Sequence, residues 1–178
     1  MSAPADISQP RALRAHDRFP YSPIHRRAGY RWPGNASLAV YVGFNIEGFA
    51  FGEGLGANLT APSPQPDVLN HSWRDYGNRV GVWRCFDLFG ALGWPVGALI
   101  KTTLFNQCPE VVAACVARGD ELIAHGHTNA ERQGEWPEPH ERSLIAYCRD
   151  RIARETGQVP TGWLSPWISE SVLTPRTC

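Results

Sequence analysis

The sequence predicts an α/β fold made of βα units on a parallel sheet or barrel. Short apolar segments rich in β-branched residues alternate with longer segments in which apolar residues recur every three or four positions. Glycine and proline stand at most boundaries between the two kinds of segment. Strands that alternate with helices form parallel sheets, because each helix carries the chain back to the start of the next strand. A length of 178 residues suits one domain with a hydrophobic core.

Four strands are expected, and each is short and apolar. The first is continuously apolar, which is typical of a strand buried on both faces. The four strands cover residues 37–44, 95–100, 121–124 and 161–164. Before the first strand, prolines recur without periodicity. We therefore expect a mobile tail over residues 1–18 and an extended arm that packs on the surface of a domain spanning residues 19–178.

Three amphipathic helices are expected between and after these strands. Their apolar residues are three or four positions apart, and a glycine marks the end of each helix. They cover residues 78–92, 109–118 and 140–156. Residues 168–171 resemble the entry to a fourth helix. Residues 49–77 form a long connection rich in Gly and Pro, which a compact domain rarely carries without a function such as a lid over a site.

Charge and composition exclude several classes of protein. Seventeen basic and 17 acidic residues balance to a formal charge of zero, and the sequence has no block of like charge. Both observations argue against a nucleic-acid or anionic-membrane partner. No apolar segment reaches the ~20 residues that cross a bilayer, and none near the start is typical of a secretory signal. Three of the five cysteines, Cys85, Cys115 and Cys148, fall in helical segments, which indicates buried free thiols in a reducing cytoplasm.

Polar side chains follow three of the four strands at the point where each strand ends. Asn45 and Glu47 follow the first strand, and Ser165 and Trp167 follow the fourth. The third strand is followed by a larger set, which consists of His125, His127, Thr128, Asn129 and Glu131. The carboxyl ends of parallel strands meet at one edge of a sheet or barrel, so these groups are expected to converge on one site.

Each group also has a purely structural interpretation. Asn45 and Glu47 could cap a loop, and Trp167 could be a packing aromatic. His125 and His127 are two positions apart and point to opposite sides of an extended chain, so the two are not expected to bind one metal. One could be a core histidine and the other a solvated one.

Asp75 and Arg79 are candidates for substrate contact. They flank Asn78, which stands at the start of the predicted helix 78–92. The alternative interpretation is a turn followed by a helix for which Asn78 is the N-cap.

Four motifs identify the closest resemblance. They are DYGNRVGVWR at residues 75–84, CPEV at 108–111, ELIAHGHTNAER at 121–132 and GWLSPW at 162–167. Together they resemble the polysaccharide deacetylase superfamily (NodB homology, carbohydrate esterase family 4), and within it the cytosolic allantoinase-like branch, from about Phe19 to Pro175. The resemblance implies a deformed, incomplete (β/α) barrel, of which this chain contains the first four or so βα units. It also implies hydrolysis of non-peptide amide C–N bonds, in N-acetyl groups of sugars or in a ureide ring.

The resemblance further implies a divalent metal, but the metal motifs are altered. The superfamily has two Asp before a Gly, one a general base and the other a metal ligand, and Glu47 stands where the ligand Asp would be. His125 matches the first of two metal-binding His, and Asn129, a poor ligand for a zinc-type ion, replaces the second. Of the Arg and two Pro in a third motif, only Pro166 remains. No metal is therefore assigned, although Glu47 and His125 could bind one, and such altered motifs are known in the allantoinase-like branch.

The superfamily continues through further βα units that include a late His acting as general acid. A complete barrel needs ~250 residues, and this sequence stops at Cys178. We therefore expect a chain truncated at its C-terminus. An incomplete barrel leaves a sheet edge exposed, which favours self-association into a homo-oligomer.

The predicted activity is amide hydrolysis, which needs an activated water, a polarised carbonyl and a proton for the leaving nitrogen. The catalytic candidates are Glu47, as base or metal ligand, and His125, as acid, base or ligand. The substrate-binding candidates are Asn45, Asn129, Trp167, Asp75 and Arg79. The expected partner is a small amide, ureide or N-acetyl-sugar substrate. Two alternatives stay open: a non-catalytic relative that binds only a small ligand or a protein, and a metal-dependent deacetylase that adds His127 and Glu131 to His125.

Overall fold

The computed structural model describes residues 19–53 and 66–177 of the chain, so the predicted tail 1–18 lies outside the described residues. The chain divides into two units, residues 1–39 and residues 40–178. In the first unit, the described residues form two short 3-10 helices, Ile24–Arg26 and Pro33–Asn35, with a single antiparallel bridge between Trp32 and Ala36. Most large apolar side chains of this arm are exposed.

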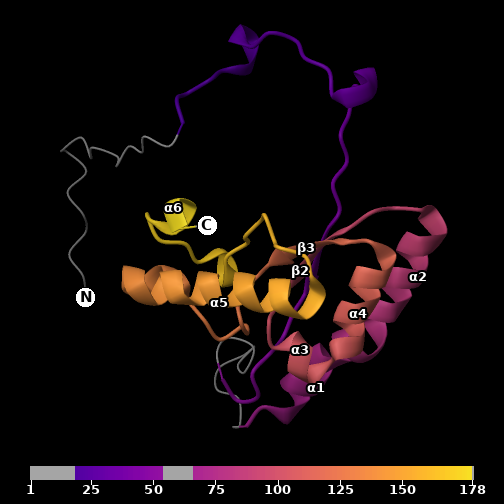
Figure 1. The fold of residues 1–178 in the computed structure, drawn as a ribbon, viewed down its shortest axis with the longest axis vertical. Coiled ribbons are helices and arrows are strands. Elements are labelled where there is room, and N and C mark those ends of the chain that lie inside the picture. Colours follow the sequence, from indigo (N-terminus) through magenta and orange to yellow (C-terminus); the bar gives the residue numbers. More distant parts are fainter. Residues whose placement is uncertain (1–18, 54–65, 178) are drawn as a thin grey trace, which may run out of the picture. The chain divides into compact units, whose positions relative to one another are not determined.

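The second unit contains a parallel sheet of three strands with the order β1-β2-β3, drawn in Figure 1. The strands are β1 (Gly43–Ile46), β2 (Gly97–Ile100) and β3 (Glu121–Ala124). Every residue of the central strand β2 is buried, as expected for a parallel strand covered on both faces. The predicted α/β class and the parallel direction of the strands are therefore confirmed. The barrel predicted from the resemblance is not established by three strands.

The first strand differs from its predicted range, 37–44. Pairing begins at Gly43, opposite Gly97, and Leu38, Val40 and Tyr41 are exposed. The partner strand β2 is short because Pro95 lies just before it and cannot donate a ladder hydrogen bond. Pairing therefore covers four residues and continues to Ile46, which is buried.

The predicted fourth strand is reduced to one bridge. Trp163 pairs with Ala124 in the parallel sense. Two hydrogen bonds make this bridge, from Ala124 N to Gly162 O at 3.1 Å and from Leu164 N to Ala124 O at 3.0 Å. Its predicted parallel direction is confirmed, but its predicted length is wrong. Pro160 and Pro166 flank the segment, and each lacks the N–H that a longer ladder needs.

The segment before the second strand is more helical than predicted. Helix α1 (Val68–Tyr76) continues through a π-helical segment, Gly77–Gly81, into α2 (Val82–Leu92). Asp67 caps α1 by accepting a hydrogen bond from Asn70 N at 2.9 Å. Asn78 is therefore inside a continuous helix and is not an N-cap. The loop predicted over 49–77 is wrong for residues 68–77, and residues 54–65 of it lie outside the described part.

The helical pattern missed α1 because this helix buries only a polar residue, Asn70. Its apolar residues Val68, Leu69 and Trp73 are exposed, so they form no stripe that faces the core. Apolar periodicity in a sequence reflects the residues that a helix buries, and α1 buries almost no apolar side chain.

The later helices follow the prediction more closely. α3 (Leu104–Gln107) was not predicted, α4 (Pro109–Arg118) confirms the second helix, and α5 (Glu138–Thr156) begins two residues before the predicted start. Gly93, Gly119 and Gly157 take left-handed conformations at the helix ends, with φ of 63°, 77° and 75°.

The fourth helix predicted to begin at residues 168–171 is wrong in position. Pro166–Ile168 is a 3-10 turn, and α6 (Thr174–Thr177) begins later. Ser171 Oγ accepts hydrogen bonds from Leu173 N at 3.0 Å and Thr174 N at 3.2 Å. This local capping moves the helix start beyond Ser171.

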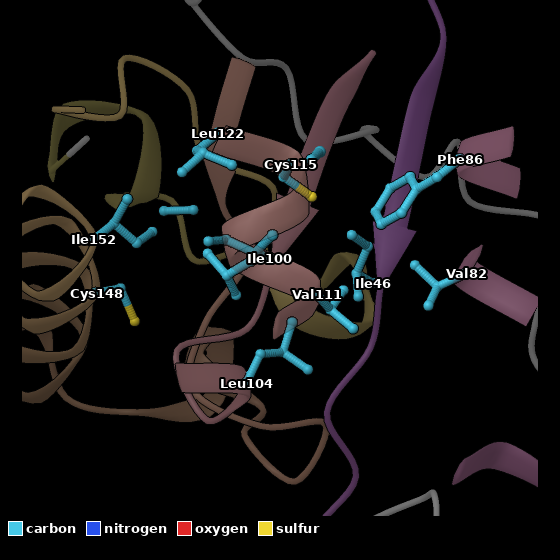
Figure 2. Close-up of a cluster of buried hydrophobic side chains, with 13 residues drawn as sticks. Ile46, Val82, Phe86, Ile100, Leu104, Val111, Cys115, Leu122, Cys148 and Ile152 are labelled. Atoms are coloured by element: carbon cyan, nitrogen blue, oxygen red, sulfur yellow. The ribbon is translucent and has the colours of Figure 1, made fainter. Parts of the chain in front are cut away.

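The core lies between the sheet and the helices, and Figure 2 shows side chains from both converging in it. It draws on all three strands and on α2, α4 and α5, with Ile46, Phe86, Ile100, Leu122 and Ile152 among its members. Burying each such side chain contributes about 1.5–3 kcal/mol. No helix within the described residues is long and apolar enough to cross a membrane.

Two of the three cysteines predicted to be buried lie in this core, whereas Cys85 is only partly buried. Cys115 on α4 and Cys148 on α5 are completely buried free thiols, and Cys85 lies on α2. Burial raises the pKa of Cys115 and of Cys148 to about 12, so both are protonated, apolar-like packing groups.

Candidate functional site

Three polar side chains meet at the carboxyl edge of the sheet because their strands pair in register. Ile46, Ile100 and Ala124 are paired across β1, β2 and β3. The next residues in each strand's path are Glu47, Lys101 and His125. The convergence predicted for the first and third strand ends is therefore observed, with a third group between them.

Glu47 and His125 are in direct contact. The Nε2 atom of His125 lies 3.2 Å from Oε1 of Glu47, and Nδ1 lies 2.6 Å from the carbonyl oxygen of Leu164. A carbonyl oxygen can only accept, so Nδ1 carries a proton. A hydrogen bond from Nε2 to the Glu47 carboxylate then requires a second proton on the ring. The hydrogen bond between Nε2 and Oε1 thus has a single proton between the two atoms.

Lys101 is the member of the site that the sequence analysis missed. Its side chain is completely buried, and Nζ lies 3.6 Å from Oε2 of Glu47. Burial lowers the pKa of Lys101 to about 8, against the opposing attraction of Glu47 and Glu131. The available signal was a lysine placed directly after an apolar strand, where a cation is expensive to bury unless it has a charged partner.

The environment keeps Glu47 ionised. Burial alone would raise its pKa, but the hydrogen bond with His125 and the charge of Lys101 together lower the pKa below its ordinary value. The Glu47 side chain is 27% exposed, although its Oε2 atom is buried. Glu47 is thus a charged acceptor with one oxygen already bound to a proton donor.

Two glycines let the loops of the site approach one another. A Cβ atom on Gly48 would lie 2.2 Å from Thr103 Cγ2, and one on Gly126 would lie 2.4 Å from Pro166 Cγ. Gly126 also has a φ of 82°, a conformation that other residues rarely adopt. Both positions therefore need glycine for the strand ends to pack as they do.

The backbone of Asn129 links the loops that follow β1 and the Trp163 bridge. Its N–H donates to Gly48 O at 2.9 Å, and its carbonyl accepts from Trp167 Nε1 at 2.7 Å. Trp167 itself takes a left-handed φ of 62°, which costs a non-glycine residue about 1–2 kcal/mol. Asn129 and Trp167 are thus next to each other and anchored to the loop of Glu47.

Two pockets lie near the end of β1, and Glu47 lines the larger of them. The larger, about 350 Å³, has mainly apolar walls, and Asn45 and Glu47 are among its polar residues. The smaller, about 220 Å³, is more polar and includes Asp75, Arg79, His71 and Gln107. Phe49 and Asn78 line both pockets. The predicted substrate residues are therefore divided, with Asn45 beside Glu47 and the Asp75–Arg79 ion pair in the adjoining pocket.

Asn78 is a second residue whose part in the site the sequence analysis missed. Its side-chain Nδ2 donates to the backbone carbonyl of Glu47 at 2.7 Å. Since Asn78 lies in the π-helical segment, this bond fixes the loop after β1 against the helix. Local pattern could not show this contact, which joins residues 31 positions apart.

The remaining polar residues after the third and fourth strands bind one another or their neighbours. His127 Nδ1 lies 2.8 Å from Thr102 Oγ1, and Glu131 accepts from Thr128 N and Oγ1 at 2.7 and 2.6 Å. Ser165 Oγ accepts from Trp163 Nε1 at 3.1 Å. Glu131 thus stabilises the turn after β3, and His127 faces away toward Thr102.

The residues at these strand ends do not fit the divalent metal that the resemblance implies. Within residues 19–53 and 66–177, no group of three or more His, Cys, Asp or Glu side chains is arranged to hold a metal ion. Glu47 and His125 already contact each other, and a lysine ammonium lies 3.6 Å from the second Glu47 oxygen. A metal ion at Glu47 would face that positive charge at close range.

Comparisons with known proteins identify the fold. No protein-family model matches this sequence, and no curated protein sequence matches it. Solved structures do match, and three of them each have a TM-score of 0.66. A Pseudomonas aeruginosa PAO1 protein described as a probable polysaccharide deacetylase is 28% identical, and 82% of this chain covers 52% of it. The Puue allantoinase is 27% identical, with coverages of 82% and 51%.

A third structure has the same fold at lower identity. It is a Mycobacterium smegmatis protein proposed as a polysaccharide deacetylase, 21% identical, with coverages of 85% and 51%. The chain thus spans about half of the length of each of these three solved structures. These neighbours are polysaccharide deacetylases and an allantoinase, so the resemblance to the polysaccharide deacetylase superfamily is supported by the fold of this chain.

Proposed function

We propose that this chain carries part of the active site of a hydrolase acting on non-peptide amide C–N bonds, of the allantoinase-like branch, with a ureide or an N-acetyl sugar as substrate. The observation that carries the proposal is the Glu47–His125 pair at the ends of β1 and β3. A carboxyl group and a histidine in contact can supply the base and the acid that amide hydrolysis requires. The identity of 27–28% with solved deacetylase and allantoinase chains supports the same class.

The proposed reaction uses Glu47 as general base and His125 as general acid. Glu47 takes a proton from water as the oxygen attacks the carbonyl carbon, and His125 gives its Nε2 proton to the nitrogen as the C–N bond breaks. The products are a carboxylic acid and an amine. Glu47 is then protonated and His125 neutral, and transfer of one proton across their 3.2 Å contact restores both.

The predicted substrate residues have separate proposed roles. The amides of Asn45 and Asn129 would donate hydrogen bonds to the reacting carbonyl, where negative charge develops in the transition state. The Asp75–Arg79 pair would accept from and donate to a ureide, whose N–H and C=O groups alternate. Trp167, 41% exposed, would cover the substrate from the side of the Trp163 bridge.

The proposed architecture is the first part of a (β/α) barrel. The solved structures are about twice as long as the part that this chain matches. Further walls of the pocket are therefore part of the proposal, and the activity is proposed for the pocket as a whole. We propose that self-association of the chain through the sheet edge accompanies this architecture.

An alternative function is ligand binding without catalysis. Asn129 in place of a metal-binding His, together with the ammonium of Lys101 beside Glu47, supports this alternative. The two functions differ in one respect that can be measured, because only a hydrolase turns over its ligand.

The test uses purified chain with a panel of ureides and N-acetyl sugars, and His125→Asn as the variant. We expect a loss of about 10²–10⁴-fold in kcat, because the acid is removed. His140→Asn is the matched control, since His140 is exposed and stacks on Trp136 away from the strand ends. Binding of a panel member without turnover by the unaltered chain, detected by calorimetry, would establish the alternative, and an unchanged rate in His125→Asn would contradict the assignment.

A further inference from the structure

Lys101 lies within the candidate site but has no hydrogen-bond partner among the described residues. Its side chain is 0% exposed, and Nζ lies 3.6 Å from Oε2 of Glu47. That oxygen is also buried without a hydrogen bond in the described part of the chain. A buried cation is strongly unfavourable unless a charge compensates it. The position of Lys101 is therefore explained by the carboxylate that faces it.

The groups around Lys101 leave Glu47 as its main counter-charge. Glu131, from the loop after β3, adds a weaker attraction, and its own oxygens are bound by Thr128. Cys148 of α5 also faces Lys101, but its thiol is neutral because burial raises its pKa to about 12. His125 contacts the other oxygen of Glu47. The Glu47 carboxylate is thus held from two sides, by Lys101 at Oε2 and by His125 at Oε1.

This arrangement resembles what a metal ion would do for a carboxylate. A cation beside one oxygen keeps the group ionised and fixes its orientation. In this chain the cation belongs to a side chain that follows β2, in register with Glu47 and His125. The second oxygen, Oε1, is then the one that exchanges a proton with His125.

We propose that Lys101 is a positioning residue whose ammonium group takes, beside Glu47, the electrostatic role of a divalent metal ion, so that the site operates without metal. Its effect on turnover rests on the proposed hydrolase function. Its effect on Glu47 does not, because the ion pair exists with or without a substrate. The two claims can therefore fail separately.

The first experiment is a pH titration of the Glu47 carboxyl carbon by ¹³C NMR in the complete chain, with Glu47→Gln to assign the signal. In Lys101→Met, which keeps the length of the side chain and removes its charge, we expect the pKa of Glu47 to rise by about one unit or more. An unchanged pKa would overturn the proposal. Arg118→Met is the matched control, because it removes a cation paired with Asp120 at 2.9 Å, just before β3 at the other end of the sheet. It should leave the Glu47 titration unchanged.

The reciprocal experiment keeps the proposal testable if Lys101→Met does not fold. The Lys101 side chain is followed by ¹⁵N NMR of Nζ in Glu47→Gln. Without its counter-charge, Lys101 should titrate further below its pKa of about 8. A Lys101 pKa that does not move would show that Glu47 is not its counter-charge and would overturn the proposal.

Turnover and metal binding separate a positioning role from a merely structural one. We expect Lys101→Met to lower kcat by about tenfold or more with KM little changed, and not to lower thermal stability, since a buried charge is replaced by an apolar group. Zinc added to the unaltered chain should not bind in stoichiometric amount. Stoichiometric zinc that is lost in Glu47→Gln would overturn the proposal. If no substrate is hydrolysed while the Glu47 pKa shifts as expected, the ion pair is supported and the hydrolase assignment fails.

Discussion

Glu47 and Glu141 are two shielded carboxylates whose surroundings differ in kind. Glu141 on α5 is 1% exposed and binds three neutral donors, Gln133 Nε2 at 3.1 Å, Ser171 Oγ at 2.6 Å and Thr174 Oγ1. Glu47 faces two groups that can themselves carry a proton, His125 and Lys101. In both, burial raises the pKa and the partners lower it below its ordinary value. The pKa is thus lowered at Glu141 by donors that only bind the carboxylate, and at Glu47 by groups that can also exchange protons with it.

The difference shows how a structural carboxylate can be told from a chemical one. Neutral donors on every side fix a carboxylate and leave it nothing to exchange, as at Glu141. At Glu47 one oxygen has no hydrogen-bond partner among the described residues, and the other shares a proton with an imidazole. Perturbed groups with titratable partners in a cleft are the ones that indicate function.

The largest expected effect on stability comes from Glu141. Replacing it with Ala leaves the donors of Ser171, Thr174 and Gln133 without their acceptor, and we expect a loss of about 3–5 kcal/mol in the free energy of unfolding. Urea unfolding measures this. Glu138→Ala, at an exposed position of the same helix, is the control and should change stability by about 0.5 kcal/mol or less. Equal losses in the two variants would show that the cluster does not anchor the segment before α6.

The second-largest expected effect is a pH dependence of stability that arises beside Glu47, at Lys101, and not beside Glu141. The pKa of Lys101 is about 8 in the folded chain against 10.5 for a free lysine. Between these values the unfolded chain binds a proton that the folded chain does not, so the free energy of unfolding rises with pH, by about 3 kcal/mol for this shift. In unfolding curves over this window, Lys101→Met should remove the rise. A rise of the same size in the variant would mean that another group causes it.

At acidic pH the two carboxylates act in the same direction. Their pKa values lie below the ordinary 4.5, so each contributes stability that is complete above about pH 4.5 and is lost as pH falls through the folded pKa. Glu141→Gln and Glu47→Gln should each reduce this acid loss. Unfolding curves extended below pH 4.5 measure this loss of stability. A loss that is unchanged in both variants would contradict the lowered pKa values of Glu47 and Glu141.

The smallest effect concerns the glycine that brings the loop after β3 against Pro166. Gly126→Ala and Gly157→Ala place alanine at similar φ, 82° and 75°, but only Gly126 has Pro166 in the way. We expect Gly126→Ala to be the more destabilising by about 1–2 kcal/mol, since the clash adds to the shared backbone strain. Thermal unfolding of the two variants gives the difference. Equal losses would mean that Pro166 moves freely.

The sequence could predict those features that local periodicity records. β3, α4 and α5 lie close to their expected ranges, because each presents apolar residues to the core at a regular spacing. α1 exposes its apolar residues, so no pattern revealed it. The first strand was misplaced because its range depends on the length of β2, which residues 37–44 do not encode.

The candidate site shows the same division. Glu47 and His125 follow strands and were visible from position alone, whereas Asn45, predicted to follow the first strand, lies within β1. The role of Lys101 depends on the register between β1 and β2, and that of Asn78 depends on a contact with the Glu47 carbonyl 31 positions away. Register and long-range contacts are properties of the folded chain, and a single sequence does not display them.

The comparison of the two carboxylates is tested most directly by one measurement, the kcat/KM for hydrolysis of a ureide or N-acetyl sugar by Glu47→Gln and Glu141→Gln side by side. Each replacement keeps the shape of the side chain and removes its charge. If Glu47 is the general base, Glu47→Gln loses about 10²–10⁴-fold, and Glu141→Gln retains the rate of the unaltered chain at a temperature where it is folded. A Glu47→Gln chain as active as Glu141→Gln would contradict the assignment of Glu47.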